Sequence, residues 1–182
     1  MKIEGEAQAG SQSDQPQSMA LPVNAANMRK LRGLFAGGVS VVTTQQADRL
    51  KGITVSAFVE VSLDPPLVLI CVANEAESRA LLEASKVFAV NILSDDQEFL
   101  SERFAARAPL VNDRFEGVPY HIASTGAPIL DQAIAWYDCR VESIYAGGDH
   151  TLFIGRVVAI GFDAEARRPL VYYANQYTRL KE

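Results

Sequence analysis

The stretch from Gly52 to Leu67 decides the fold: residues 52–58 are GITVSAF, and after three more residues comes SLDPPL at 62–67. β-Branched residues dominate Gly52–Val61, which is typical of a strand. A polar turn at Gln45–Arg49 separates it from the similar run Gly38–Thr44, so the two runs predict a hairpin. Pro65 and Pro66 must break the sheet, because proline has no N–H to donate.

The same stretch presents a polar edge. The hydroxyls of Thr54 and Ser56, with the backbone around Ala57, lie ahead of a sharp turn that leaves backbone groups free to face a ligand. A flat heteroaromatic ring with a polar rim, such as an isoalloxazine, would fit such an edge. On the chemistry of these residues alone, a strand pair with a proline-stiffened loop and no ligand is the favoured explanation.

Further strands are expected on both sides of this stretch. The apolar run Leu67–Ala73 predicts a central strand buried on both faces, and Val87–Leu93 a second buried strand. The last third predicts the strands Ala133–Tyr145, Leu152–Phe162 and Leu170–Tyr173. Residues 105–128, rich in proline and glycine, are expected to be irregular.

Three short helices are expected between these strands. Asn24 is the predicted N-cap of a helix that ends at Gly37-Gly38, Ser78 that of a helix through Ala84, and Asp95 or Asp96 that of a helix through Phe104. In the third helix Phe99, Leu100 and Phe104 would form the apolar stripe. Few helices and hairpin-linked strands favour a closed antiparallel barrel over a βαβ sheet. No strand, Gly-rich turn and helix follow one another as a Rossmann fold requires.

Length and composition limit the functions available. The 182 residues suit one domain, with residues 1–22 a disordered tail and residues 23–182 the folded domain. A net charge of −5 excludes a nucleic-acid binder, since no Lys and Arg cluster is present. No apolar run is long enough to span a membrane and no signal peptide is evident, so we expect a cytoplasmic protein. Cys71 and Cys139 are expected to be reduced, and two histidines are too few for a metal site.

Five segments together resemble the flavin reductase-like family, whose members supply reduced flavin to two-component monooxygenases. They are the 52–67 signature, AGGVSVVTT (36–44), FAVNIL (88–93), GDH (148–150) with GRV (155–157), and PLVYY (169–173). The resemblance covers roughly residues 27–178. It implies a mainly β fold with a few short helices, the antiparallel Greek-key split β-barrel that binds FMN. It also implies a homodimer, FMN or FAD as cofactor, NADH or NADPH as hydride donor, and a monooxygenase partner.

The resemblance also implies the site residues. The flavin phosphate would lie at Asn74–Arg79, where Ser78 caps a helix beside Arg79; from the residues alone, a plain cap with a solvated arginine is equally compatible. His150, at the exit of the Gly147-Gly148 turn, would bind and orient the nicotinamide, as would Tyr173, although a lone turn histidine is usually a surface residue. Asn91 would need a partner in its buried strand. The residues expected to contact flavin are Thr54, Val55, Ser56, Ala57, Asp64, Pro65, Pro66, Leu67, Cys71, Asn74, Ser78, Arg79, Phe88, Ala89 and Asn91.

Two other functions remain compatible with the sequence. A related split-barrel oxidase would act on a small substrate with tightly held FMN, and a flavin-binding module would have no turnover. The oxidase would need more basic residues for a substrate phosphate than this chain offers. Consumption of a reduced nicotinamide distinguishes the reductase from the binding module.

Overall fold

The computed structural model describes residues 19–107, 113–165 and 167–180, in two compact units, Met1–Arg32 and Gly33–Glu182. The first unit contains helix α1 (Ala25–Arg32). The Asn24 Oδ1 accepts the Asn27 N–H at 2.9 Å, which confirms the predicted N-cap. The helix stops at Arg32 rather than at Gly37, because Gly33 follows it directly. Most of the predicted tail lies outside the described residues; residues 19–22 are exposed and have no regular structure.

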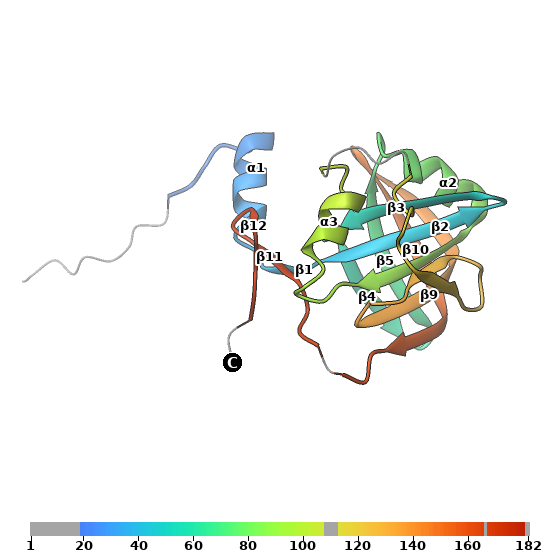
Figure 1. Cartoon of the computed structure of the whole chain (residues 1–182). Coiled ribbons are helices and arrows are strands. Elements are labelled where there is room, and N and C mark those ends of the chain that lie inside the picture. Colours follow the sequence, from blue (N-terminus) through green and yellow to red (C-terminus); the bar gives the residue numbers. More distant parts are fainter. Residues whose placement is uncertain (1–18, 108–112, 166, 181–182) are drawn as a thin grey trace, which may run out of the picture. The chain divides into compact units, whose positions relative to one another are not determined.

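Seven antiparallel strands of the second unit form one sheet in the order β3-β2-β6-β9-β10-β5-β4. Their bounds are β2 (Ser40–Gln46), β3 (Arg49–Val55), β4 (Phe58–Leu63), β5 (Pro66–Ala73), β6 (Val87–Ile92), β9 (Ala135–Gly147) and β10 (His150–Phe162). The edge strands β3 and β4 are joined by only two residues, Ser56 and Ala57, so the two edges must meet and the sheet closes into a barrel (Figure 1). Strand β6 follows β5 in sequence but pairs with β2 and β9, the non-sequential pairing of a Greek key.

Shorter elements surround the barrel. Helix α2 (Glu77–Ser85) connects β5 to β6, and helix α3 (Glu98–Phe104) follows β6. A three-stranded sheet contains β1 (Gly37–Gly38), β11 (Val171–Tyr173) and β12 (Gln176–Thr178), and a two-stranded sheet contains β7 (Tyr120–Ile122) and β8 (Pro128–Leu130). The sequence did not predict β1, β7, β8 and β12, because strands of two or three residues are too short for an alternating pattern.

Two strands of the barrel are buried on both faces. In β2 and β6, consecutive residues such as Val41 and Val42 are buried, because one face lines the barrel and the other is covered. Val42 packs inside with Phe88 and Phe153, whereas Val41 packs outside with Leu100 and Phe104 of α3. The prediction for Val87–Leu93 is therefore confirmed. The same prediction for Leu67–Ala73 is wrong: β5 alternates between buried and half-buried residues, so only one of its faces is fully covered.

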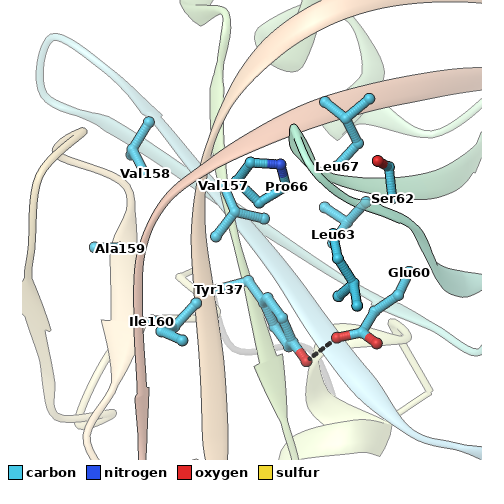
Figure 2. Close-up of a pocket in the computed structure, with 11 residues that line it drawn as sticks. Glu60, Ser62, Leu63, Pro66, Leu67, Tyr137, Val157, Val158, Ala159 and Ile160 are labelled. Atoms are coloured by element: carbon cyan, nitrogen blue, oxygen red, sulfur yellow. Dashed lines mark hydrogen bonds between the residues drawn. The ribbon is translucent and has the colours of Figure 1, made fainter.

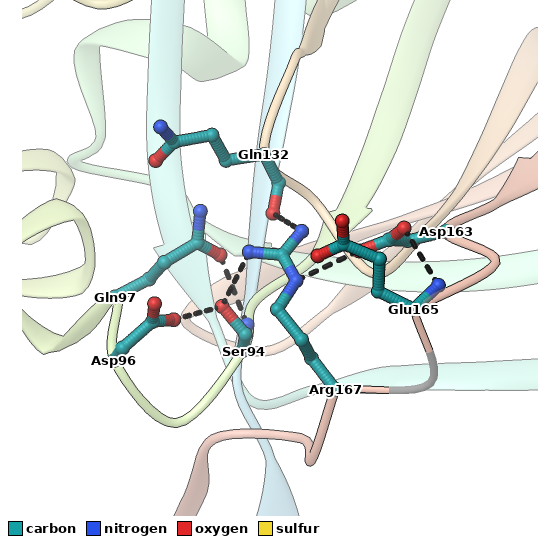
Figure 3. A network of polar contacts seen from close by, with 7 residues as sticks. All are labelled: Ser94, Asp96, Gln97, Gln132, Asp163, Glu165 and Arg167. Carbon is teal, nitrogen blue, oxygen red and sulfur yellow. Dashed lines mark hydrogen bonds and ion pairs between the residues drawn. The ribbon is translucent and has the colours of Figure 1, made fainter.

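Other boundaries also differ from the prediction. The predicted strand Gly52–Val61 is divided at Ser56-Ala57 into β3 and β4, although the hairpin of β2 and β3 is confirmed. Helix α3 is preceded by Gln97, not capped by Asp95 or Asp96, and Phe99 is exposed. Figure 3 shows the reason: the Asp96 carboxylate accepts the Ser94 hydroxyl proton, while the Gln97 Oε1 accepts the Ser94 N–H at 2.9 Å.

The loop after β10 is fixed to the same place. The Arg167 Nε donates to Asp163 at 2.7 Å and its Nη2 donates to the Gln132 carbonyl at 2.9 Å (Figure 3). Asp95 N–H also donates to the Arg168 carbonyl at 2.9 Å. These bonds hold the segment that leads from the barrel into β11. In the described part of the chain, no helix has both the length and the apolar character to cross a membrane.

Candidate functional site

The bend between β3 and β4 forms one open edge of the barrel. Ser56 and Ala57 are exposed, and the Ala57 carbonyl accepts the Cys71 N–H of β5 at 3.2 Å. Val55, by contrast, is buried in the barrel core. The Thr54 hydroxyl donates to the Ser101 carbonyl of α3 at 2.6 Å, so it holds the helix in place. Of the predicted polar edge, Ser56 and Ala57 are therefore the parts that face outward.

The proline turn lies at the other end of β4. Asp64 and Pro65, joined by a cis peptide bond, form the tip of the β4–β5 hairpin, where Leu63 pairs with Pro66. The 6 residues of β4 separate this tip from Ala57, which corresponds to about 20 Å of strand. Residues 52–67 thus form two separate surfaces in one chain, so the flavin contacts predicted at Asp64, Pro65, Pro66 and Leu67 lie apart from those predicted at Ser56 and Ala57, and they stay a prediction. Sequence proximity hid this, because the strand between the two motifs has a regular alternating pattern.

Two of the predicted segments meet at the start of β10. His150 pairs with Ala73 in the β5–β10 ladder, so Asn74 lies beside the Gly148-Asp149 turn. The Asn74 N–H donates to the Asp149 carbonyl at 3.0 Å, and its Nδ2 donates to the Gly148 carbonyl at 3.1 Å. The His150 Nδ1 lies 2.7 Å from the Asp149 carboxylate, which fixes the ring orientation. Cys71, three residues before Asn74, brings the Ala57 bend toward this end of the barrel.

The start of α2 completes the cluster. The helix begins at Glu77, and Ala76 rather than Ser78 occupies the N-cap position, so the predicted cap is wrong. Ser78 is buried instead, and its Oγ has no hydrogen-bond partner among the residues that the structure describes. Arg79 donates from Nε to the Asn74 carbonyl at 3.1 Å and pairs with Glu83 at 2.7 Å.

Sequence reasoning missed a cation at this place. The Lys51 Nζ lies 2.7 Å from the Glu77 Oε2, across from the first turn of α2. This hydrogen bond and the positive charge of Lys51, with that of Arg114, hold the pKa of Glu77 below its usual value. Lys51 directly precedes Gly52, so its position next to the 52–67 signature could have indicated this cation from the sequence. Lys51 of β3 and Arg79 of α2 therefore place two positive charges at the first turn of α2, where the buried Ser78 hydroxyl has no partner among the described residues.

Several predicted site residues lie in the interior. Phe88, Ala89 and Asn91 have no exposed surface. Asn91 is satisfied within the chain: its Nδ2 donates to the Val41 carbonyl at 3.0 Å, and its Oδ1 accepts the Leu130 N–H at 2.8 Å. The need for a partner is confirmed, but the partners are backbone groups of β2 and β8 and the Thr43 hydroxyl. These three residues shape the barrel rather than line its surface.

The two cysteines and the C-terminal tyrosines complete the predicted set. Cys71 and Cys139 are free thiols, as expected, and burial raises the pKa of both. Tyr172 packs on Tyr177, with ring centroids 5.2 Å apart, while Tyr173 is exposed. Of these two adjacent tyrosines, Tyr172 therefore faces the core and Tyr173 faces outward. Tyr173 lies on the β1-β11-β12 sheet and His150 on the barrel sheet. Among the described residues no three His, Cys, Asp or Glu side chains converge on a metal site.

Comparison with known proteins supports the resemblance. Residues 31–181 match the family described as flavin reductase like domain. The chain belongs to this family. The flavin reductase-like family therefore accounts for nearly all of the second unit, from β1 to β12, and the resemblance inferred from the five segments is confirmed.

Relatives in the flavin reductase-like family are similar over most of their length. The reductase subunit HsaB of a flavin-dependent monooxygenase from Rhodococcus jostii is 35% identical over 159 residues, which are 87% of this chain and 80% of that protein. An NADH-dependent FAD reductase from Streptomyces globisporus is 38% identical over 146 residues, 79% of each chain.

Solved structures of the family have the same fold. The NADH:FAD oxidoreductase SgcE6 from Streptomyces globisporus matches with a TM-score of 0.84 and 34% identity, over 92% of this chain and 100% of that chain. SgcE6 has also been solved in complex with NAD and FAD fragments, and that structure matches with a TM-score of 0.82 and 33% identity, over 91% of this chain and 98% of that chain. The split-barrel fold expected from the sequence is confirmed.

Proposed function

We propose that this chain is an NAD(P)H-dependent flavin reductase, which transfers a hydride from a reduced nicotinamide to FMN or FAD. The reduced flavin then serves a partner flavin-dependent monooxygenase. The proposal depends chiefly on one observation: the outward bend at Ser56-Ala57, the start of α2 and the His150 turn all lie toward one end of a barrel of the flavin reductase-like family. Relatives with this fold are named as NADH-dependent flavin reductases or as reductase subunits of monooxygenases.

The start of α2 fits the flavin phosphate. A phosphate would accept a hydrogen bond from Ser78, whose buried Oγ has no partner among the described residues. Its negative charge would be stabilised by the N-terminus of α2 and by Lys51 and Arg79. Lys51 would then exchange Glu77 for the phosphate, since Glu77 is exposed and its pairing with Lys51 costs little to break.

The role of the chain's own residues is to bind and orient the flavin and the nicotinamide, because a bound flavin would supply the redox chemistry without a strong acid or base from the protein. Ser56 and the backbone of Ala57 would hold the polar rim of the ring system. His150, fixed by Asp149 and by the Asn74-held turn, would orient the nicotinamide.

A homodimer would cover the apolar outer face of the barrel. Leu63, Ile160 and Phe162 on β4 and β10 are 86%, 68% and 81% exposed, which is costly for a protein surface. Leu63 and Ile160 also line a groove of about 330 Å³, together with Pro66 and Val157 (Figure 2). Tyr137 lines the same groove, and its hydroxyl donates to Glu60 at 2.8 Å. A second copy related by a two-fold axis would bury the same face of each chain. The Asp64–Leu67 tip lies at this face, so it would meet the partner copy.

Nicotinamide consumption tests the function directly. Purified protein is mixed with FMN or FAD and with NADH or NADPH, and the absorbance of the nicotinamide band is followed. Flavin-dependent loss of absorbance is expected with at least one of the four pairs. Bound flavin with no loss for any pair would contradict the proposal and favour a binding module.

The phosphate assignment has its own test. Lys51→Met and Ser78→Ala should each weaken flavin binding about tenfold, measured by quenching of flavin fluorescence. Lys86→Met, a lysine just after the C-terminal end of α2, serves as the control and should leave flavin affinity unchanged. Unchanged affinity in both Lys51→Met and Ser78→Ala would remove the phosphate from the start of α2.

A further inference from the structure

Both polar atoms of the Asn74 side chain have partners within the chain. Its Nδ2 donates to the Gly148 carbonyl at 3.1 Å, and its Oδ1 accepts the Thr151 hydroxyl proton at 2.8 Å. The backbone of the same residue donates to the Asp149 carbonyl at 3.0 Å and accepts from the Arg79 Nε at 3.1 Å. All four polar groups of Asn74 therefore have partners, and three of these partners lie in residues 148–151.

We infer that Asn74 is a positioning residue for His150 and not a ligand of the flavin. The inference rests on the proposed function, in which His150 orients the nicotinamide. Gly148 has a φ of 70°, a left-handed conformation that favours glycine, so the turn depends on outside contacts to keep one geometry. Asn74 supplies these contacts on both sides of His150, to Gly148 before it and to Thr151 after it.

The hydrogen bond from Arg79 also connects Asn74 to helix α2. Arg79 Nε holds the Asn74 carbonyl while its Nη1 pairs with Glu83, so the first turn of α2 and the His150 turn are connected through a single residue. The phosphate end and the nicotinamide end of the site therefore keep a fixed spacing. Each polar atom of Asn74 already has one partner within the chain, so a hydrogen bond from Asn74 to the flavin would have to share or replace the bonds that hold the turn.

Three variants distinguish a positioning role of Asn74 from a role as a flavin ligand. Asn74→Ala removes both side-chain bonds, Asn74→Asp keeps the acceptor for Thr151 and loses the donor to Gly148, and Thr151→Val removes the hydroxyl with little change of shape. Asn74→Ala should raise the apparent KM for NADH about fivefold while the Kd for flavin, measured without nicotinamide, changes less than twofold. The other two should move the KM in the same direction by less.

Histidine NMR supplies a readout that does not depend on turnover. The chain has only two histidines, His121 and His150, so its ring spectrum contains two sets of signals, assigned with His121→Gln. In Asn74→Ala and Thr151→Val, the His150 signal should shift and the His121 signal should stay, because His121 pairs with Asp131 on a different sheet.

Two results would overturn the inference: a flavin Kd raised fivefold or more with the KM for NADH unchanged, or a His150 signal and KM that match the wild type in all three variants. If Asn74→Ala does not fold, Thr151→Val and Asn74→Asp still decide the question. Failure of the proposed function is distinguishable, since wild-type protein would then consume no NADH while the His150 signal would still shift in Asn74→Ala.

Discussion

Gly155 of β10 leaves no room for a methyl group, and its substitution gives the sharpest test of the barrel packing. An alanine Cβ at this position would lie 2.4 Å from the Phe88 Cζ, 2.7 Å from its Cε1 and 3.0 Å from the Cys139 Cβ. Carbon atoms in contact are normally about 3.5–4.0 Å apart. Phe88 has no exposed surface and packs in the barrel core with Val90 and Phe153, so its ring has no free space to move into.

Overpacking of this kind costs about 1–3 kcal/mol of unfolding free energy. For a chain of this size, Gly155→Ala should therefore lower the Tm by roughly 2–12 °C. The assay is thermal unfolding followed by circular dichroism at one fixed protein concentration, because the Tm of the proposed dimer would depend on concentration. Gly38→Ala is the matched control, since a Cβ there meets no atom within 4 Å and Gly38 has no positive φ.

A double variant checks the cause. Phe88→Leu removes the ring atoms that would clash, so Gly155→Ala should cost less in that background than in the wild type. The reasoning would be refuted by a Gly155→Ala protein whose Tm equals that of Gly38→Ala. It would also be refuted if the cost of Gly155→Ala were the same with Phe88 and with Leu at position 88.

Three further outcomes are expected. His150→Ala should raise the apparent KM for the nicotinamide about tenfold, or 1.4 kcal/mol, and unchanged steady-state kinetics would remove its assignment. Glu77→Gln should tighten flavin binding, because it removes a carboxylate beside the proposed phosphate and frees Lys51; weaker binding in a fluorescence titration would contradict this. Burial, with smaller contributions from Glu60 and Glu102, raises the pKa of Tyr137 and Tyr177 to about 12, as burial does for Cys139. These groups ionise in the unfolded chain before the folded one, so the Tm should fall as pH rises from 9 toward 12, and a flat profile would show that they are not protected.

The fold was predictable from sequence where strands are long and alternate. The β2–β3 hairpin, the buried strand at Val87–Leu93 and the long pair β9 and β10 follow from β-branched runs and from turns rich in glycine. The division of β3 from β4 was not, because Ser56 and Ala57 fit a strand pattern, and the bend appears only when the two sheet edges meet. The prediction that β5 is buried on both faces was wrong for a related reason. An apolar run does not indicate whether the outer face of a strand packs against another element or is exposed to solvent.

The candidate site was predictable in its segments but not in its contacts. Asn74 and the His150 turn were both found from sequence, yet their pairing across the β5–β10 ladder is a property of the register. Lys51 was missed because a lysine on a strand is usually solvated. Ser78 was predicted as the N-cap of α2 but lies two residues after the actual N-cap, Ala76. Asn91 was correctly expected to need a partner, but sequence does not tell a ligand from a backbone carbonyl.

The separation of Ser56-Ala57 from the Asp64-Pro65 tip by a whole strand means that one continuous sequence motif forms two separate structural units. An exchange of the hairpin tip for that of another family member is therefore expected to leave the bend in place, since Phe58, Val59 and Glu60 pair with β5 between the bend and the register shift after Glu60. Such chimaeras would separate what governs pairing of subunits from what governs cofactor choice, and they would do so with a transplant of only a few residues.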